Sequence, residues 1–166
     1  MNIRGILNST SFFSVVLDAG QLDDLAAATS EVRFGRGEVL MRQGEIGTAM
    51  YVLTDGKVTV SVHQPGGDKT VATLGPGEVV GEMAVITGER RSATVKAKGR
   101  VTALEITKAA LAPLLAAEPK LAHRFGTMIE QRTGELTGRR DKVRQSISVG
   151  LGREQIAARM TSYYSG

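Results

Sequence analysis

The sequence contains no cysteine, which excludes disulfide bonds and thiolate metal sites and fits a reducing compartment. It has no apolar run near the roughly 18 residues of a membrane span and no signal-like start, so we expect a soluble, cytoplasmic chain. Its two histidines, His63 and His123, lie far apart in the chain and do not form a metal-ligand cluster. No nucleophile with a base and an orienting group stands out. We therefore expect no catalytic residues, no metal ligands, no cofactor and no enzymatic activity.

The basic charge is concentrated at the end of the chain. Residues 132–166 hold seven Lys and Arg against three Asp and Glu, which accounts for the whole net charge of +4. A nucleic acid or an anionic lipid could contact such a segment, and the alternative is a solvated helix with a frayed end. No aromatic residues interleave these arginines and no recognition-helix pattern follows them, so we favour the solvated segment and expect no nucleic-acid partner.

The order of predicted elements is a helix, a β-rich middle and further helices. Residues 1–30 form an N-terminal helical segment, with an amphipathic helix over 17–29. Short β-prone runs cut by glycines fill residues 31–106, and Asp55-Gly56 is a two-residue hairpin signal. Helices follow over 107–145, with Pro113 and Pro119 opening separate segments, and residues 146–166 are expected to be a loosely ordered tail. This order predicts an α+β fold, an antiparallel, jelly-roll-like β-roll flanked by helices.

The last predicted helix has one apolar face. The residues on it are Leu121, Phe125, Met128, Ile129, Arg132 and Leu136. Arg132 is the long cation on this stripe, and two roles stay open for it: a charge at the helix surface, or a cation stacked on a ligand ring.

The segment "VVGEMAVITGERRSATV", residues 79–95, places charges inside an apolar β region. If a helical turn starts at Gly81, its free N–H groups point at one spot, where an anion could bind. Arg91 could give that anion a bidentate guanidinium. A carboxylate such as Glu82 should repel an anion unless the ligand also carries hydroxyl donors. A phosphate beside a free ribose hydroxyl describes a cyclic nucleotide.

The segment "GEMAVITGERRSATV" resembles the phosphate-binding cassette of cyclic nucleotide-binding domains. The upstream runs "RFGRGEVLMRQGEIGTAMYVLTDGKVTVSV" and "ATLGPGEVVGEM" are similar to the family's strands before the cassette, and the resemblance covers about residues 10–137. It implies a reversible sensor of cAMP, with cGMP as a second candidate ligand, whose C-terminal helices close over the base as a lid.

The resemblance also implies roles for individual residues. Arg91 would hold the cyclic phosphate and Glu82 the ribose 2′-hydroxyl. The other implied ligand contacts are backbone contacts from Gly81, Met83 and Ala84, the hydroxyl of Ser92, the base pocket at Val71 and the base cap at Arg132. The simpler alternatives are a solvated charge for Arg91 and a strand-edge hydrogen bond for Ser92. Arg90 stands where relatives often have proline, and we expect its side chain in solvent.

Three outputs fit such a sensor. The favoured one is regulation of an attached or partner effector, a membrane-embedded ion channel, with oligomers formed through the parent protein. The alternatives are a stand-alone cAMP-binding regulatory subunit and the sensor half of a transcription regulator without its DNA-binding domain.

Overall fold

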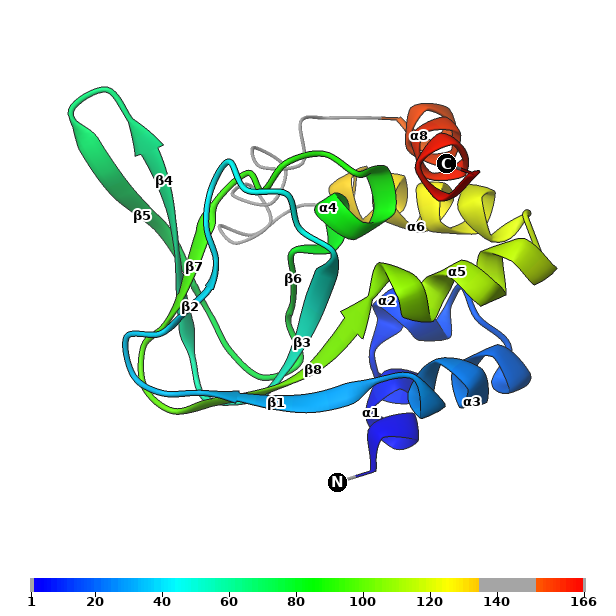
Figure 1. Cartoon of the computed structure of the whole chain (residues 1–166), viewed down its shortest axis with the longest axis horizontal. Helices are drawn as coiled ribbons and strands as arrows, with labels where there is room; N and C mark the ends of the chain where they lie inside the picture. The colour runs from blue at the N-terminus through cyan, green and yellow to red at the C-terminus, as the bar shows by residue number, and fades with distance from the viewer. Residues whose placement is uncertain (1, 135–151, 166) are drawn as a thin grey trace.

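The computed structural model describes residues 2–134 and 152–165, except for the side chains of residues 132–134. Two antiparallel four-stranded sheets stand beside a group of helices that comes from both ends of the chain (Figure 1). This architecture confirms the predicted α+β fold with an antiparallel β-roll and flanking helices. Within the described ranges, no helix combines the length and the apolar character needed to cross a membrane.

The N-terminal segment holds three short helices, α1 Ile3–Ser9, α2 Ser11–Ser14 and α3 Ala19–Ala27. The predicted amphipathic helix is α3, and it starts two residues later than expected because Asp18 caps it. The Asp18 carboxylate accepts from the Gln21 N–H at 2.8 Å, and the Gln21 side chain accepts from the Asp18 N–H at 2.9 Å. This reciprocal capping box fixes the first turn of the helix.

The eight strands in the described part of the chain form two sheets. One has the order β1-β8-β3-β6 and the other β2-β7-β4-β5, and every pairing is antiparallel. The strands are β1 Ser30–Phe34, β2 Val39–Met41, β3 Ala49–Asp55, β4 Val58–Gln64, β5 Gly67–Leu74, β6 Val79–Val80, β7 Thr94–Ala97 and β8 Val101–Thr107.

The predicted hairpin at Asp55-Gly56 is wrong. Gly56 does take a positive φ of 84°, as the turn signal requires, but β3 before it and β4 after it belong to different sheets. A tight turn favours a change of direction without fixing which strands pair. The two-residue hairpin lies at Pro65-Gly66, where Gln64 of β4 faces Gly67 of β5.

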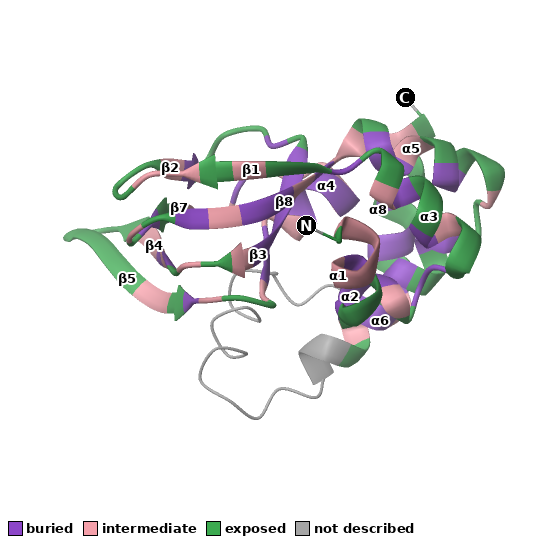
Figure 2. Cartoon of the chain, turned by 90° about the horizontal axis from the view of Figure 1, so that it is seen from below, coloured by how far each residue is buried: buried purple, intermediate pink, exposed green. Residues whose placement is uncertain are grey.

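Alternating residues of the first sheet contribute to two separate cores. On β3, Met50 and Val52 face the helices, whereas Tyr51 and Leu53 face the inside of the roll. Successive side chains of a strand point to opposite faces, so this sheet is buried on both sides. Figure 2 shows that β8 is mostly buried, with residues of intermediate exposure between the buried ones. The sheet therefore joins the helical layer to the roll.

The C-terminal part forms α5 Lys108–Ala117, α6 Leu121–Gly134 and α8 Arg153–Ser165. Pro119 precedes α6 as predicted, whereas Pro113 lies inside α5 and does not open a segment. The expectation of a loosely ordered tail is wrong for residues 153–165, because α8 buries Ile156, Ala157 and Met160 in the helical core. Polar residues separate these apolar ones in the sequence, so the tail reads as hydrophilic.

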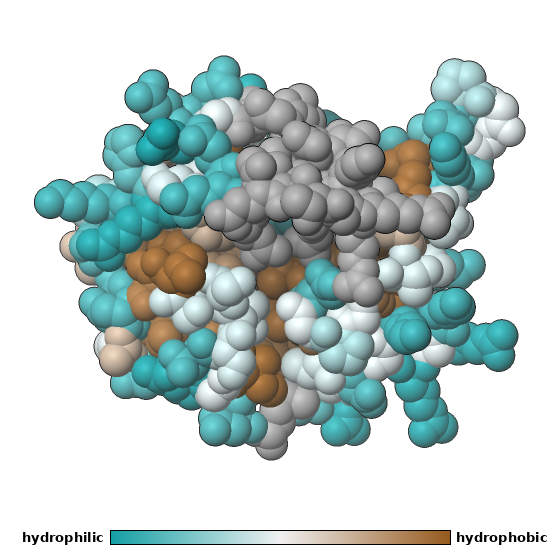
Figure 3. All heavy atoms as spheres, turned by 180° about the vertical axis from the view of Figure 1, so that it is seen from behind, coloured by the Kyte–Doolittle hydropathy of each residue, from teal (hydrophilic) through white to brown (hydrophobic). Residues whose placement is uncertain are grey.

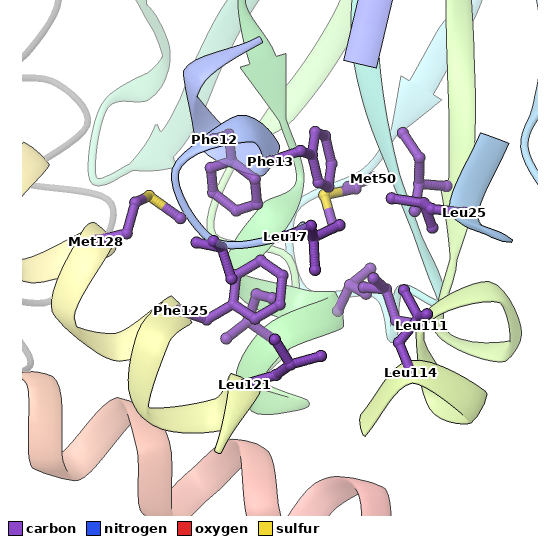
Figure 4. Close-up of a cluster of buried hydrophobic side chains, with 14 of the residues drawn as sticks. Phe12, Phe13, Leu17, Leu25, Met50, Leu111, Leu114, Leu121, Phe125 and Met128 are labelled. Atoms are coloured by element: carbon purple, nitrogen blue, oxygen red, sulfur yellow. The ribbon is translucent and has the colours of Figure 1, made fainter. Parts of the chain in front are cut away.

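The apolar face of α6 lies in the helical core. Leu121, Phe125 and Met128 are buried there with Phe12 and Phe13 of α2, as the close-up in Figure 4 shows. The Phe12 and Phe125 ring centroids are 5.9 Å apart. This face is therefore covered by neighbouring helices.

On the molecular face opposite to Figure 1, hydrophilic residues dominate the visible rim and apolar ones gather in patches between them (Figure 3).

Candidate functional site

The segment after β6 forms a short helix, α4 Glu82–Thr87, bounded by a glycine at each end. Gly81 before it has φ 78° and Gly88 after it has φ 77°, and this left-handed region favours glycine. The predicted helical turn at Gly81 is thus present. The residues Met83, Ala84, Val85 and Ile86 are all buried, which anchors the helix to the molecule.

Arg91 is buried, with 8% of its surface exposed. Its Nη2 donates to the Ala49 carbonyl at 2.6 Å and its Nη1 to the Gly81 carbonyl at 3.0 Å. The alternative of a solvated loop charge is therefore wrong. A guanidinium has five N–H donors, so three remain beyond these two bonds among the described residues. Arg91 itself lines the cavity described below, which places a buried cation beside it.

Burial lowers the pKa of Arg91, because a desolvated cation is less stable than a hydrated one. Tyr51, Glu82 and Glu45 oppose this effect in that order. Glu82 stands in the first turn of α4, so the structure brings a carboxylate and a buried guanidinium into one electrostatic environment. The site can therefore offer both a cation and a hydrogen-bond acceptor to one ligand.

A cavity of about 70 Å³ opens at this point. Six of the residues singled out from the sequence line it together: Gly81, Glu82, Met83, Ala84, Arg91 and Ser92. The Ser92 hydroxyl makes no hydrogen bond to another described residue, so the strand-edge alternative finds no support. Seven apolar lining residues were not singled out from the sequence: Met41, Val60, Leu74, Val79, Val80, Ala93 and Val95, all but Ala93 on strands of the two sheets. Met41, Val60 and Leu74 lie outside the segment 79–95 and could be found only by knowing which strands face it.

Two of the expected residues are not among the lining residues. Val71 lies half-buried on β5 and packs against the core inside the roll. Arg132 belongs to the last turn of α6, but its side chain lies outside the described part of the structure. Arg90 is exposed as expected; its Nη1 donates to the Gly44 carbonyl at 3.0 Å, and it also borders the cavity.

Helix α8 packs against the outer side of the cassette. The Tyr164 hydroxyl donates to the Val85 carbonyl at 3.0 Å, and the Tyr163 ring fills the space beside Gly88. The Lys108 ammonium lies 3.8 Å from the centre of the Tyr163 ring. These contacts connect α4 with the C-terminal helices. No sequence signal pointed to them.

In the described ranges, no three histidine or carboxylate side chains come close enough together to hold a metal ion. The site is instead a small, mainly apolar cavity with one buried arginine and one glutamate at its edge. Such a site suits an organic anion with an apolar part and at least one hydroxyl group.

The family profile of the cyclic nucleotide-binding domain matches residues 31–118, which contain the whole cavity. A candidate potassium channel protein from Rhodopseudomonas palustris is 36% identical over 118 residues, which are 71% of this chain and 28% of that protein. A cyclic nucleotide-gated potassium channel from Mesorhizobium japonicum is 38% identical over 98 residues, 59% of this chain and 26% of the channel. The chain thus spans about a quarter of the length of these relatives.

A solved structure has the same fold. The N-terminal domain of a transcriptional regulator from Streptomyces coelicolor A3(2) superposes with a TM-score of 0.65 at 28% identity, over 88% of this chain and 95% of that domain.

Proposed function

Because the chain belongs to the cyclic nucleotide-binding domain family, we propose that it is a sensor that binds cAMP or cGMP and regulates an effector. The observation that carries the proposal is the buried Arg91, which lines the cavity together with Glu82. In the proposed complex, Arg91 holds the cyclic phosphate and Glu82 accepts from the ribose 2′-hydroxyl. A bidentate, charge-assisted pair with phosphate is among the strongest polar contacts in proteins.

The remaining ligand contacts follow from the same cavity. Gly81, Met83 and Ala84 would contribute backbone groups to the phosphate, and the Ser92 hydroxyl a hydrogen bond near phosphate and base. The apolar residues from the two sheets would cover the base. Val71 does not line the cavity and would reach the base only if the roll moves on binding. Arg132 would cap the base from the last turn of α6.

The cavity supports such a movement. Its volume of about 70 Å³ is well below the roughly 300–1,000 Å³ of typical small-molecule pockets. A cyclic nucleotide would therefore extend beyond the cavity or widen it, and for widening the cassette with its glycine-bounded α4 is the element placed to shift. By linkage, the ligand can change the output only through its different affinities for the two states.

We propose a membrane-embedded ion channel as the effector, since two relatives are named as potassium channels. The domain would then act without catalysis, at the cytoplasmic face of a membrane, as one part of a longer protein that forms oligomers. The structural likeness to a transcriptional regulator's N-terminal domain supports a second candidate, the sensor part of such a regulator. The full-length reading frame separates them: apolar 20-residue segments indicate a channel, and a DNA-binding helix-turn-helix indicates a regulator.

The binding proposal is tested by isothermal titration with cAMP and cGMP side by side. We expect a dissociation constant in the micromolar range or below for at least one of them, and much weaker binding of 5′-AMP, whose phosphate does not close onto the ribose. No heat and no thermal shift at millimolar cAMP or cGMP would refute the proposal.

A further inference from the structure

We propose that Gly47 is a positioning residue for Arg91, because its missing side chain leaves the space in which the guanidinium lies. Gly47 belongs to the loop between β2 and β3 and is not one of the residues that line the cavity. The inference rests on the proposed function in one respect, the role of Arg91 as the phosphate ligand. The contact between Gly47 and the Arg91 guanidinium is a feature of the ligand-free protein and does not depend on that role.

The space beside Gly47 is filled by Arg91. A Cβ atom added to Gly47 would lie less than 3.0 Å from Nε, Cζ and Nη2 of Arg91, closer than real Cβ atoms approach another atom, and these are its three nearest atoms. Gly47 is also absent from the glycines with positive φ, so its backbone conformation suits any residue. The need for glycine at this position therefore comes from the Arg91 side chain and not from the loop.

Arg91 cannot move aside without losing its partners. Its two hydrogen bonds go to the carbonyls of Ala49 and Gly81, on elements that are paired in a sheet or capped onto α4. On its other side, a Cβ on Gly81 would lie 2.5 Å from Arg91 Nη1. The guanidinium thus fits between two glycines, and filling either space displaces it.

The same loop also fixes the backbone of Arg91. The Gly44 N–H donates to the Arg91 carbonyl at 2.7 Å, and the Arg91 N–H donates to the Glu45 carbonyl at 2.8 Å. One loop therefore sets both where the Arg91 backbone runs and where its side chain lies. This arrangement orients the remaining N–H donors before a ligand arrives, which lowers the cost of binding.

The test is the variant Gly47→Ala, with Gly99→Ala as the matched control. Gly99 has no positive φ and no atom within 4 Å of an added Cβ, so its methyl group should be neutral. We expect Gly47→Ala to keep the fold but to weaken binding of cAMP or cGMP at least about tenfold, with the Arg91 Nε–H resonance shifted in NMR spectra. Unchanged affinity and an unchanged resonance in a folded Gly47→Ala protein would overturn the proposal.

A double-mutant cycle with Arg91→Ala separates positioning from general damage. In the Arg91→Ala protein the clashing atoms are gone, so Gly47→Ala should change neither affinity nor melting temperature further. An equal penalty in both backgrounds would show that Gly47 acts on something other than Arg91 and would overturn the proposal. If Gly47→Ala alone does not fold, folding of the double variant supports the proposal, and failure of both refutes it.

The two failures can be told apart. If the wild-type chain binds neither nucleotide, the proposed function fails, while the melting temperatures of the cycle still test the contact between Gly47 and Arg91. If the wild type binds and the cycle is additive, only the positioning role fails.

Discussion

At the scale of single residues, two adjacent arginines differ in burial and should differ in function. Arg91 is buried and Arg90 is exposed, although both contact the loop after β2. We expect Arg91→Ala to weaken cyclic nucleotide binding by about 2–4 kcal/mol, because a desolvated phosphate loses its charge-assisted partner. Arg90→Ala should cost less than about 1 kcal/mol, as is usual for exposed charges. Titration of both variants checks this, and equal losses would contradict the assigned roles.

Much of this site could be predicted from the sequence because its charged residues are local. Glu82, Arg91 and Ser92 lie within one short segment and line one cavity. Gly47 could not be found in this way. Its role depends on a side chain 44 positions later in the chain, and a glycine in a loop between two strands carries no mark of what it faces.

At the scale of elements, the contact between α8 and the cassette can be tested through one hydroxyl group. Val85 lies in the last turn of α4, where helix carbonyls lack an intrahelical partner, and the Tyr164 hydroxyl donates to it. Burial also raises the pKa of Tyr164, so its hydroxyl stays protonated and able to donate. We expect Tyr164→Phe to lower the free energy of unfolding by about 0.5–1.5 kcal/mol in denaturant titrations.

The neighbouring tyrosine gives the control. The Tyr163 hydroxyl makes no hydrogen bond to another described residue. The Tyr163 ring contacts Gly88 and Lys108, and the Tyr163 backbone carbonyl accepts from Lys108. Tyr163→Phe keeps these contacts and should change the free energy of unfolding by less than about 0.5 kcal/mol. A similar loss for both variants would mean that the Tyr164 hydroxyl does not hold α8.

The lid hypothesis is best tested at Arg132. The resemblance implies the lid, and the apolar face of α6 is already covered by neighbouring helices, so closure has no exposed apolar face of α6 to bury. A truncation that removes residues 128–166 would not test the lid cleanly, because it would take Met128, Ile129 and Met160 out of the core. We therefore expect the informative change to be Arg132→Ala, with a loss of roughly 0.5–2 kcal/mol in binding if the guanidinium stacks on the base.

Arg124 on the same helix is the control for Arg132. It is paired with Glu118 at 3.3 Å on the surface, so Arg124→Ala should leave the binding of cAMP and cGMP unchanged. If Arg132→Ala binds both nucleotides as tightly as the wild type does, α6 does not act as a lid through this residue.

Local sequence signals predict the positions of helices and strands better than they predict which strands pair. The apolar spacing of α6 and the helix start at Pro119 were predicted, because both depend on neighbours in the sequence. The strands that pair with β3 could not be predicted from local signals. The turn glycine after β3 sets the backbone φ there, but long-range packing decides which sheet the next strand joins. Gly126 is a similar case: by propensity alone a glycine inside a helix costs about 1 kcal/mol against alanine. A Cβ there would clash with the Arg153 carbonyl, so this glycine allows α8 to cross α6 closely.

At the scale of the whole molecule, the two cores share the strands β3 and β8, so the roll and the helices should unfold together. Met50 and Leu104 belong to the helical core, while Leu53 and Ala103 belong to the roll, and neither core can be lost without the strands of the other. We expect one unfolding transition, with helical circular dichroism and the NMR signals of strand amides melting at the same temperature.

Ligand binding should then stabilise parts of the molecule that the ligand does not touch. A nucleotide at 100 times its dissociation constant adds about 2.7 kcal/mol, which for a chain of this size raises the melting temperature by roughly 5–11 °C. The helical signal should shift by the same amount as the strand signal, although the cavity lies in the roll and the cassette. Arg91→Ala at the same ligand concentration is the control and should shift little. Two separate transitions, or a shift confined to the strand signal, would mean that the shared sheet does not couple the helices to the site, and the path from ligand to effector would have to avoid α6 and α8.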